Sequence, residues 1–208
     1  MFEFNSSKMT LKKSEITSAY IVKTVAPVFN KKGYFGTSMS DITHATGLTK
    51  GAIYGNFKDK NELAVNAFVY NIKLISTQFE KAISGNKNSI EKLFSISTFY
   101  HDYYEFTHQF GGCPILNVGI DANHQNAALT QKVKKAITNL QNNLVHILAQ
   151  GIEKGEIKKG VSATKYARKI FAIIEGFVFM ATTQNDKKYM DELTETLTHL
   201  IQTELIQN

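Results

Sequence analysis

Proline and cysteine are scarce in this chain of 208 residues, which contains two prolines and one cysteine. The shortage of proline permits long helices, because a proline inside a helix removes a backbone donor and clashes with the preceding turn. The single cysteine, Cys113, excludes an internal disulfide framework and suits a reducing cytoplasm.

Long hydrophobic runs are also missing. A membrane-spanning helix needs roughly eighteen or more apolar residues, whereas the longest run here, 170–181, is shorter and contains Glu175. The first residues, MFEFNSSKMTLKKSE, lack the apolar segment and the cleavage site of a signal peptide. We therefore expect no transmembrane helix, no secretion signal and no membrane partner.

Positive charge is concentrated at one end of the chain. Residues 1–60 contain nine lysines and four acidic residues, while the other 148 residues contain 15 basic and 14 acidic residues. Such a basic segment is typical of a nucleic-acid-binding module. A solvated basic arm would give the same pattern, so charge alone leaves the choice open.

Apolar residues recur at helical spacing through most of the chain, which predicts an all-α fold. We expect a flexible basic arm over 1–13 and a first helix over 14–32, kinked or loosened at Pro27 and stopped at Gly33. Further helices are expected near 39–46, 50–57, 61–83, 90–108, from Pro114 onward, 127–153, 162–183 and 187–206.

The segment 37–57 predicts a helix-turn-helix. Ser38 and Asp41 form a capping-box pattern with Asp in place of Glu. Gly47 allows a tight turn at positive φ, and Thr49 can cap the second short helix. Two short helices joined in this way are typical of a DNA-binding motif.

Several polar or small residues of this segment are then left to face a DNA groove. Lys50 can reach base or phosphate acceptors, Gly51 lets the backbone approach the duplex, and Tyr54 can contact a phosphate or a thymine methyl. Hydroxyls near a helix N-terminus favour phosphate. The candidate DNA contacts are Thr37, Ser38, Ser40, Thr49, Lys50, Gly51, Ala52, Tyr54, Asn56 and Lys60.

Residues 14–63 resemble the DNA-binding domain of the TetR/AcrR family of bacterial repressors. The matching residues are Phe29 to Tyr34, Thr37, Asp41, Ile42, Gly47, Lys50, Gly51, Ile53, Tyr54, Phe57, Lys60, Glu62 and Leu63. Two features depart from the family pattern: Gly55 and Asn56 stand where His or another large residue often precedes Phe57, and Pro27 lies in the first helix.

The resemblance implies a three-helix DNA-binding domain over 14–60 and a helical ligand-binding and dimerisation domain over 61–208. It places Lys50, Gly51 and Tyr54 at the groove and Lys60 on a phosphate. It also implies a homodimer in the bacterial cytoplasm that binds a palindromic operator and is released by an unknown small-molecule effector.

The second domain has three candidate ligand features: an aromatic run over 99–110, a cysteine and a glutamate. Tyrosine and histidine give an apolar wall polar groups, although core packing explains any single aromatic. Cys113 precedes Pro114, where a helix dipole favours a thiolate, although a lone cysteine is more often inert. A solvated rim position is the plainer interpretation of Glu175. The candidate ligand contacts are Phe99, Tyr103, Phe106, Cys113 and Glu175.

The last two expected helices are strongly apolar, and two such helices pair naturally with their twofold copies in a four-helix bundle. We expect dimer contacts at Phe177, Leu193, Leu197 and Leu200. Packing inside one chain is the alternative.

No enzyme, cofactor or metal site is expected. His101, His108, Cys113 and His124 lack a compact ligand spacing, and phosphate-binding glycine loops, nucleophile elbows and paired catalytic carboxylates are absent from the sequence. The sequence predicts a repressor released from its operator by a small, largely apolar ligand. A helical enzyme or carrier with a vestigial DNA-binding part, and a constitutive DNA binder with a filled core, are the competing hypotheses.

Overall fold

The computed structural model describes residues 13–108, 110–123 and 125–206. Residues 1–12, where we expected a flexible arm, and His124 lie outside these ranges. Within them the chain is helical and has no β-strand, which confirms the expected all-α class. The elements are α1 (Lys13–Gly36), α2 (Met39–Thr46), α3 (Lys50–Tyr54), α4 (Lys60–Ile83), α5 (Ser89–His108), α6 (Pro114–Ala122), α7 (Ala127–Glu153), α8 (Ala163–Gln184), α9 (Lys188–Leu200) and a π-helical turn, Ile201–Leu205.

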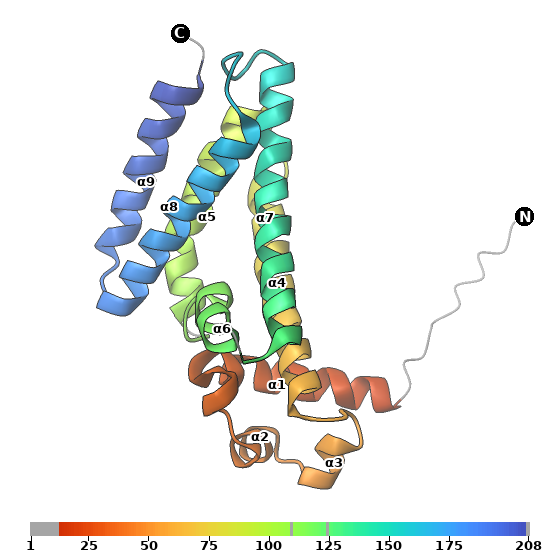
Figure 1. Cartoon of the computed structure of the whole chain (residues 1–208). Helices are drawn as coiled ribbons and strands as arrows, with labels where there is room; N and C mark the ends of the chain where they lie inside the picture. The colour runs from red at the N-terminus through yellow and green to blue at the C-terminus, as the bar shows by residue number, and fades with distance from the viewer. Residues whose placement is uncertain (1–12, 109, 124, 207–208) are drawn as a thin grey trace, which may run out of the picture.

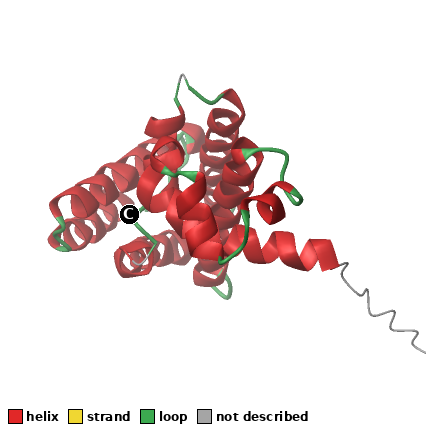
Figure 2. Ribbon diagram, turned by 90° about the horizontal axis from the view of Figure 1, so that it is seen from below, coloured by secondary structure: helices red, strands yellow, loops and turns green. Residues whose placement is uncertain are grey.

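The long helices α4, α5, α7, α8 and α9 form one elongated bundle, and α1, α2 and α3 lie together at its lower end (Figure 1). Helix α1 runs across that end and packs against α4 and α6. The view from below shows α1 extending beyond the bundle on one side (Figure 2). No helix in the described part of the chain is long and apolar enough to cross a membrane.

Buried apolar side chains form two separate clusters. The smaller one joins α1, α2, α3 and the first turns of α4, where it includes Leu63, Ala64 and Ala67. The larger one fills the bundle from Phe68 to the C-terminal turn. Helix α4 therefore belongs to both clusters, and the expected domain boundary at residue 60 falls at its first residue rather than between the two cores.

The backbone of helix α1 is helical at Pro27 and is interrupted at Gly33, where we expected the helix to stop. The backbone stays helical through Pro27, and non-helical angles within α1 occur at Gly33, with φ of 73° and ψ of 173°. A side chain at Gly33 would also meet the Asp121 carboxylate at 3.1 Å. The break in the helical backbone therefore lies at the glycine, and a bend at Pro27 stays a prediction.

A hydrogen-bond network joins α1 to the turn before α6. The Asn30 side-chain amide donates to the carbonyls of Phe110 and Gly112 at 2.7 and 2.8 Å. The Asn117 amide donates to the Asn30 carbonyl at 3.0 Å and to the Gly111 carbonyl at 2.7 Å. Asn30 is buried, so these bonds replace water that the site excludes. We call this set the α1–α6 junction.

Candidate nucleic-acid interface and candidate ligand site

The expected capping box begins α2. The backbone N–H of Asp41 donates to Ser38 Oγ at 3.1 Å, and the Ser38 N–H donates to Asp41 Oδ2 at 2.8 Å. Lys32 Nζ also contacts the Asp41 carboxylate. The hydrogen bonds from Lys32 and Ser38 hold the Asp41 pKa well below its usual range.

The turn and the second short helix follow the expected pattern. Gly47 ends α2 in the left-handed region, with φ of 67°. Thr49 caps α3, because its Oγ1 accepts from the Ala52 N–H at 3.2 Å. Ile53 is buried against the smaller core. The start of α3 is thus fixed by a local hydrogen bond, and its inner face by the core that it shares with α1 and α4.

The opposite face of α3 is open to solvent. Lys50 and Gly51 are exposed, Ala52 is half-buried, and the Tyr54 side chain is 42% exposed. The Lys50 ammonium lies 5.8 Å from the centre of the Tyr54 ring, so the cation and the phenol form one polar patch. Ser38, Ser40 and Thr49 are exposed at the starts of α2 and α3.

Three expected DNA contacts are instead engaged inside the protein. Thr37 is fully buried, and its hydroxyl donates to the Gly33 carbonyl at 2.6 Å. Asn56 Oδ1 accepts from the Ser18 hydroxyl, and its amide donates to the Ala52 carbonyl, both at 2.9 Å. These contacts satisfy both side chains within the domain.

Lys60 is the third residue. Its ammonium donates to the carbonyls of Tyr34 and Thr37, each at 2.9 Å, and lies 4.5 Å from the centre of the Tyr34 ring. It therefore joins the start of α4 to the end of α1 and to the residue that follows it. We no longer include Thr37, Asn56 or Lys60 among the residues that face DNA.

A polar cluster lies inside the larger core, where α5, α6 and α8 meet. Cys113 caps α6, with Pro114 as the first helical residue, as expected. Its thiol donates to Glu175 Oε2 of α8 at 3.6 Å. Tyr100 and Tyr103 of α5 are both buried beside this pair. We call these four residues the Glu175 cluster.

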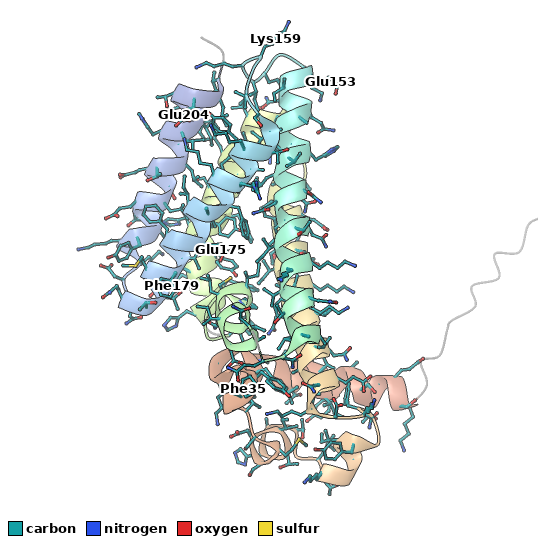
Figure 3. All side chains as sticks on the ribbon, viewed as in Figure 1. Phe35, Glu153, Lys159, Glu175, Phe179 and Glu204 are labelled. Atoms are coloured by element: carbon teal, nitrogen blue, oxygen red, sulfur yellow. The ribbon has the colours of Figure 1, made fainter. Side chains whose placement is uncertain are left out.

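Burial decides the protonation of the cluster. It raises the pKa of Cys113 to about 12, and the negative charge of Glu175 acts in the same direction. Burial also raises the pKa of Glu175 to about 7. The expected thiolate at Cys113 is therefore wrong, because desolvation outweighs the N–H groups at the start of α6. Glu175 is half-buried, midway along the bundle in Figure 3, so it is less exposed than the solvated rim position that the sequence suggested.

Three of the other expected ligand residues line a surface groove. Phe99, Tyr103 and Phe106 form one wall of an open cavity of about 510 Å³ between α4 and α5. Gln78, Lys81 and Ala82 form the α4 wall. By contrast, the cavity beside Tyr100 has about 10 Å³, which is no more than one water needs. We call the open cavity the α4–α5 groove.

The expected dimer contacts divide into two groups. Leu193, Leu197 and Leu200 are buried in the core of a single chain, where α9 packs on α5 and α8. They cannot meet a partner, and that expectation is wrong. Phe177 is half-buried against the same core. Phe179, which sequence reasoning missed, is 45% exposed on α8, and Figure 3 shows it on the flank of the bundle.

Comparisons with known proteins agree with this architecture. The family described as "Bacterial regulatory proteins, tetR family" matches residues 21–67, and "Tetracyclin repressor-like, C-terminal domain" matches residues 89–197. A TetR-family regulator from Cytophaga hutchinsonii has a solved structure that is 36% identical, with a TM-score of 0.90, covering 96% of this chain and 100% of that one. The chain belongs to the TetR family of transcriptional regulators.

Two further relatives extend this result. A regulator from Chloroflexus aurantiacus is 31% identical over 95% of this chain and 100% of its own, with a TM-score of 0.90. The fatty acid metabolism regulator protein of Bacillus subtilis is 25% identical over 81% of this chain and 84% of its own. These homologues regulate transcription and are not enzymes. Among the residues that the structure describes, no group of three or more His, Cys, Asp or Glu side chains could hold a metal ion.

Proposed function

We propose that this TetR-family protein is a homodimeric repressor that binds a palindromic operator through α3 and is released by a small, largely apolar ligand. The observation that carries the proposal is the exposed face of α3, where Lys50, Gly51 and Tyr54 stand opposite the buried Ile53. A short, rigidly capped helix with a low outer surface suits insertion into a major groove.

The DNA contacts have separate physical roles. Lys50 supplies a charge that a guanine edge or a phosphate attracts, and Gly51 allows close approach. Tyr54 can donate its hydroxyl or pack on a thymine methyl. Ser38, Ser40 and Thr49 stand near the N-termini of α2 and α3, where phosphate is favoured. The concentration of basic charge in residues 1–60 also supports DNA binding by this end of the chain.

The test is operator binding by Lys50→Ala and Tyr54→Ala, measured by fluorescence anisotropy on the upstream region of the protein's own gene. Each substitution is expected to cost about 1–3 kcal/mol of specific binding. Lys50→Ala is also expected to reduce the salt slope by about one. The matched control is Lys87→Ala, which removes an exposed lysine from the loop between α4 and α5, far from α3. Unchanged affinity in both α3 variants would rule out this surface.

Dimerisation is proposed through the exposed face of α8 rather than through the α9 leucines. Ala172, Gly176, Phe179 and Thr183 are exposed at helical spacing, and Phe177 lies half-buried beside them. A twofold copy of this face would bring two α8 helices together with small residues at the centre. Each protomer would then present one α3 to one half-site of a palindrome.

Ligand control is supported by the α4–α5 groove and by one relative. A structure of the Bacillus subtilis regulator FadR, 23% identical with a TM-score of 0.74, is described as a complex with stearoyl-CoA. Helix α4 connects the groove with the DNA-binding helices, so it can transmit a change. We place the repressor in the bacterial cytoplasm, where its operator is found.

A constitutive DNA binder is the second candidate, and one observation favours it. The interior cavities beside Tyr100 and beside Asn71 have only about 10 Å³ each, so the described core is already filled there. A ligand must therefore bind in an open cavity, such as the α4–α5 groove or the cavity of about 210 Å³ between α4 and α7, or displace core side chains. Operator binding that no compound weakens would favour the constitutive candidate.

A further inference from the structure

Glu175 stands in the bundle without a cation. The ion pairs found among the described residues do not include it, and its contact is the weak donor Cys113. Burial raises the pKa of Glu175 to about 7, so the acid is neutral at lower pH and is a carboxylate without a cationic partner at higher pH. Holding that charge at a half-buried position is costly, and a neutral amide or an apolar side chain would avoid the cost at every pH. The chain nevertheless places an acid here, which points to a partner that is not part of the protein.

The surroundings of Glu175 are aromatic. Tyr100 and Tyr103 have ring centres 5.3 Å apart, and Phe99 lies 5.1 and 5.7 Å from them. Aromatic faces attract cations, and rings beside a carboxylate are the usual environment of a bound organic ammonium group. An anionic ligand would meet the charge of Glu175 and the negative faces of these rings.

Tyr103 connects this cluster to the surface. Its side chain is a wall of the α4–α5 groove, and it also contacts Cys113, which in turn contacts Glu175. Asp102 and Lys81 also line this groove, so its rim carries one charge of each sign and does not by itself select a cation. Movement of the Tyr103 side chain would therefore join the groove of about 510 Å³ to the Glu175 carboxyl.

We propose that the effector of this regulator is an organic cation with an apolar body, that its body occupies the α4–α5 groove, and that its ammonium group pairs with Glu175 when Tyr103 swings aside. This inference rests on the proposed ligand control and names the ligand class. The cation replaces the thiol as the partner of the carboxylate. The apolar body then contacts Phe99 and Phe106, which are only half-buried in the absence of ligand.

The test uses two probes of the same shape. Benzyltrimethylammonium carries the positive charge, and neopentylbenzene replaces its nitrogen with carbon. Binding to the full chain without DNA is measured by calorimetry for the wild type, Glu175→Gln and Asp102→Asn. Glu175→Gln keeps the size of the side chain, and Asp102→Asn is the matched control that removes a carboxylate from the groove entrance. Melting temperatures establish that both variants are folded.

The wild type is expected to bind the cation at least about tenfold more tightly than its neutral isostere, because a desolvated charge pair contributes that much or more. Glu175→Gln is expected to abolish this preference, and Asp102→Asn is expected to keep most of it. Equal binding of the two probes, no binding of either, or a preference that survives in Glu175→Gln would overturn the proposal. Loss of the preference in Asp102→Asn alone would also overturn it, because the charge would then act at the entrance.

Operator binding is measured separately, so the two proposals can fail separately. A Glu175-dependent preference for the cation, without any loss of operator affinity in its presence, would keep the ligand class and reject release by ligand. Release of the operator by the neutral isostere, with no preference for the cation, would keep release by ligand and reject the ligand class.

Discussion

The two ends of the molecule are held by contacts of different range. Around α2 and α3, the decisive bonds join Ser38 to Asp41 and Thr49 to Ala52, three residues apart in each case. In the bundle, Cys113 meets Glu175 across 62 residues, and His101 meets Asp191 across 90. The two short helices are thus capped by their own local sequence, although their inner faces pack on α1 and α4, whereas the Glu175 cluster exists only when distant helices pack.

The contrast extends to burial. The outer face of α3 is exposed, and its polar groups are in contact with solvent. In the Glu175 cluster, Cys113, Tyr100 and Tyr103 are buried and Glu175 is half-buried beside them, so these groups contact one another more than solvent. A substitution on α3 should therefore change binding without changing stability, whereas a substitution in the bundle should change both. The predictions below test this difference.

The largest effect is expected from Leu197→Ala. Leu197 is 2% exposed, so its removal leaves a cavity and should lower the free energy of unfolding by about 2–5 kcal/mol. Phe179→Ala, on the exposed face of α8, should instead weaken the dimer with a smaller change in protomer stability. Urea unfolding and sedimentation measure the two quantities. If Leu197→Ala dissociated the dimer and left stability unchanged, α9 would be the interface after all.

The second effect is a pH dependence that belongs to Glu175. Its pKa is raised from 4.5 to about 7, so the folded state holds this proton more tightly than the unfolded chain does. The stabilisation is complete below pH 4.5 and is lost as the pH rises through about 7, and it amounts to at most about 3 kcal/mol. Cys113, Tyr100 and Tyr103 remain protonated over this range because their pKa values are raised.

Urea unfolding of the wild type and Glu175→Gln between pH 4.5 and pH 8 checks this prediction. The difference between their unfolding free energies should change across the range in favour of the variant at high pH. Parallel curves would show that Glu175 keeps an ordinary pKa and is more hydrated than the structure indicates.

The smallest effect concerns the cap of α2. Ser38→Ala removes the acceptor for the Asp41 N–H and should cost about 1 kcal/mol of stability. Ser40→Ala is the control, because Ser40 is the exposed second residue of the same helix and does not cap it. Thermal melting of the two variants is the measurement. Equal stability of both would mean that Lys32 and Asp41 hold α2 without the cap.

The range of the contacts also explains what could be read from the sequence. The capping box, the turn at Gly47 and the inner position of Ile53 depend on neighbours within a few residues, and each was predicted. Asn56 was misjudged because its partner Ser18 lies 38 residues away. Lys60 was misjudged because the carbonyls it binds carry no sequence signal.

The bundle was harder to predict for the same reason. An apolar stripe on α9 shows that Leu193, Leu197 and Leu200 are buried, but not whether the covering surface is α5 of the same chain or a second copy. The helix dipole argument for Cys113 was sound locally, yet it omitted Glu175 and the two tyrosines, which only the fold brings to the thiol. Residues 99, 103 and 106 were placed together because they share one helix.

The α1–α6 junction has a thermodynamic consequence. Cys113 follows Gly112, whose carbonyl accepts a hydrogen bond from Asn30 of α1, so a ligand that displaced the thiol would disturb the turn that this bond joins to α1. Coupling between two sites is reciprocal: if the ligand lowers operator affinity by a given factor, the operator lowers ligand affinity by the same factor. The DNA-bound protein would therefore bind the effector with a higher dissociation constant than the free protein does. Asn30→Ala should make these two dissociation constants more similar.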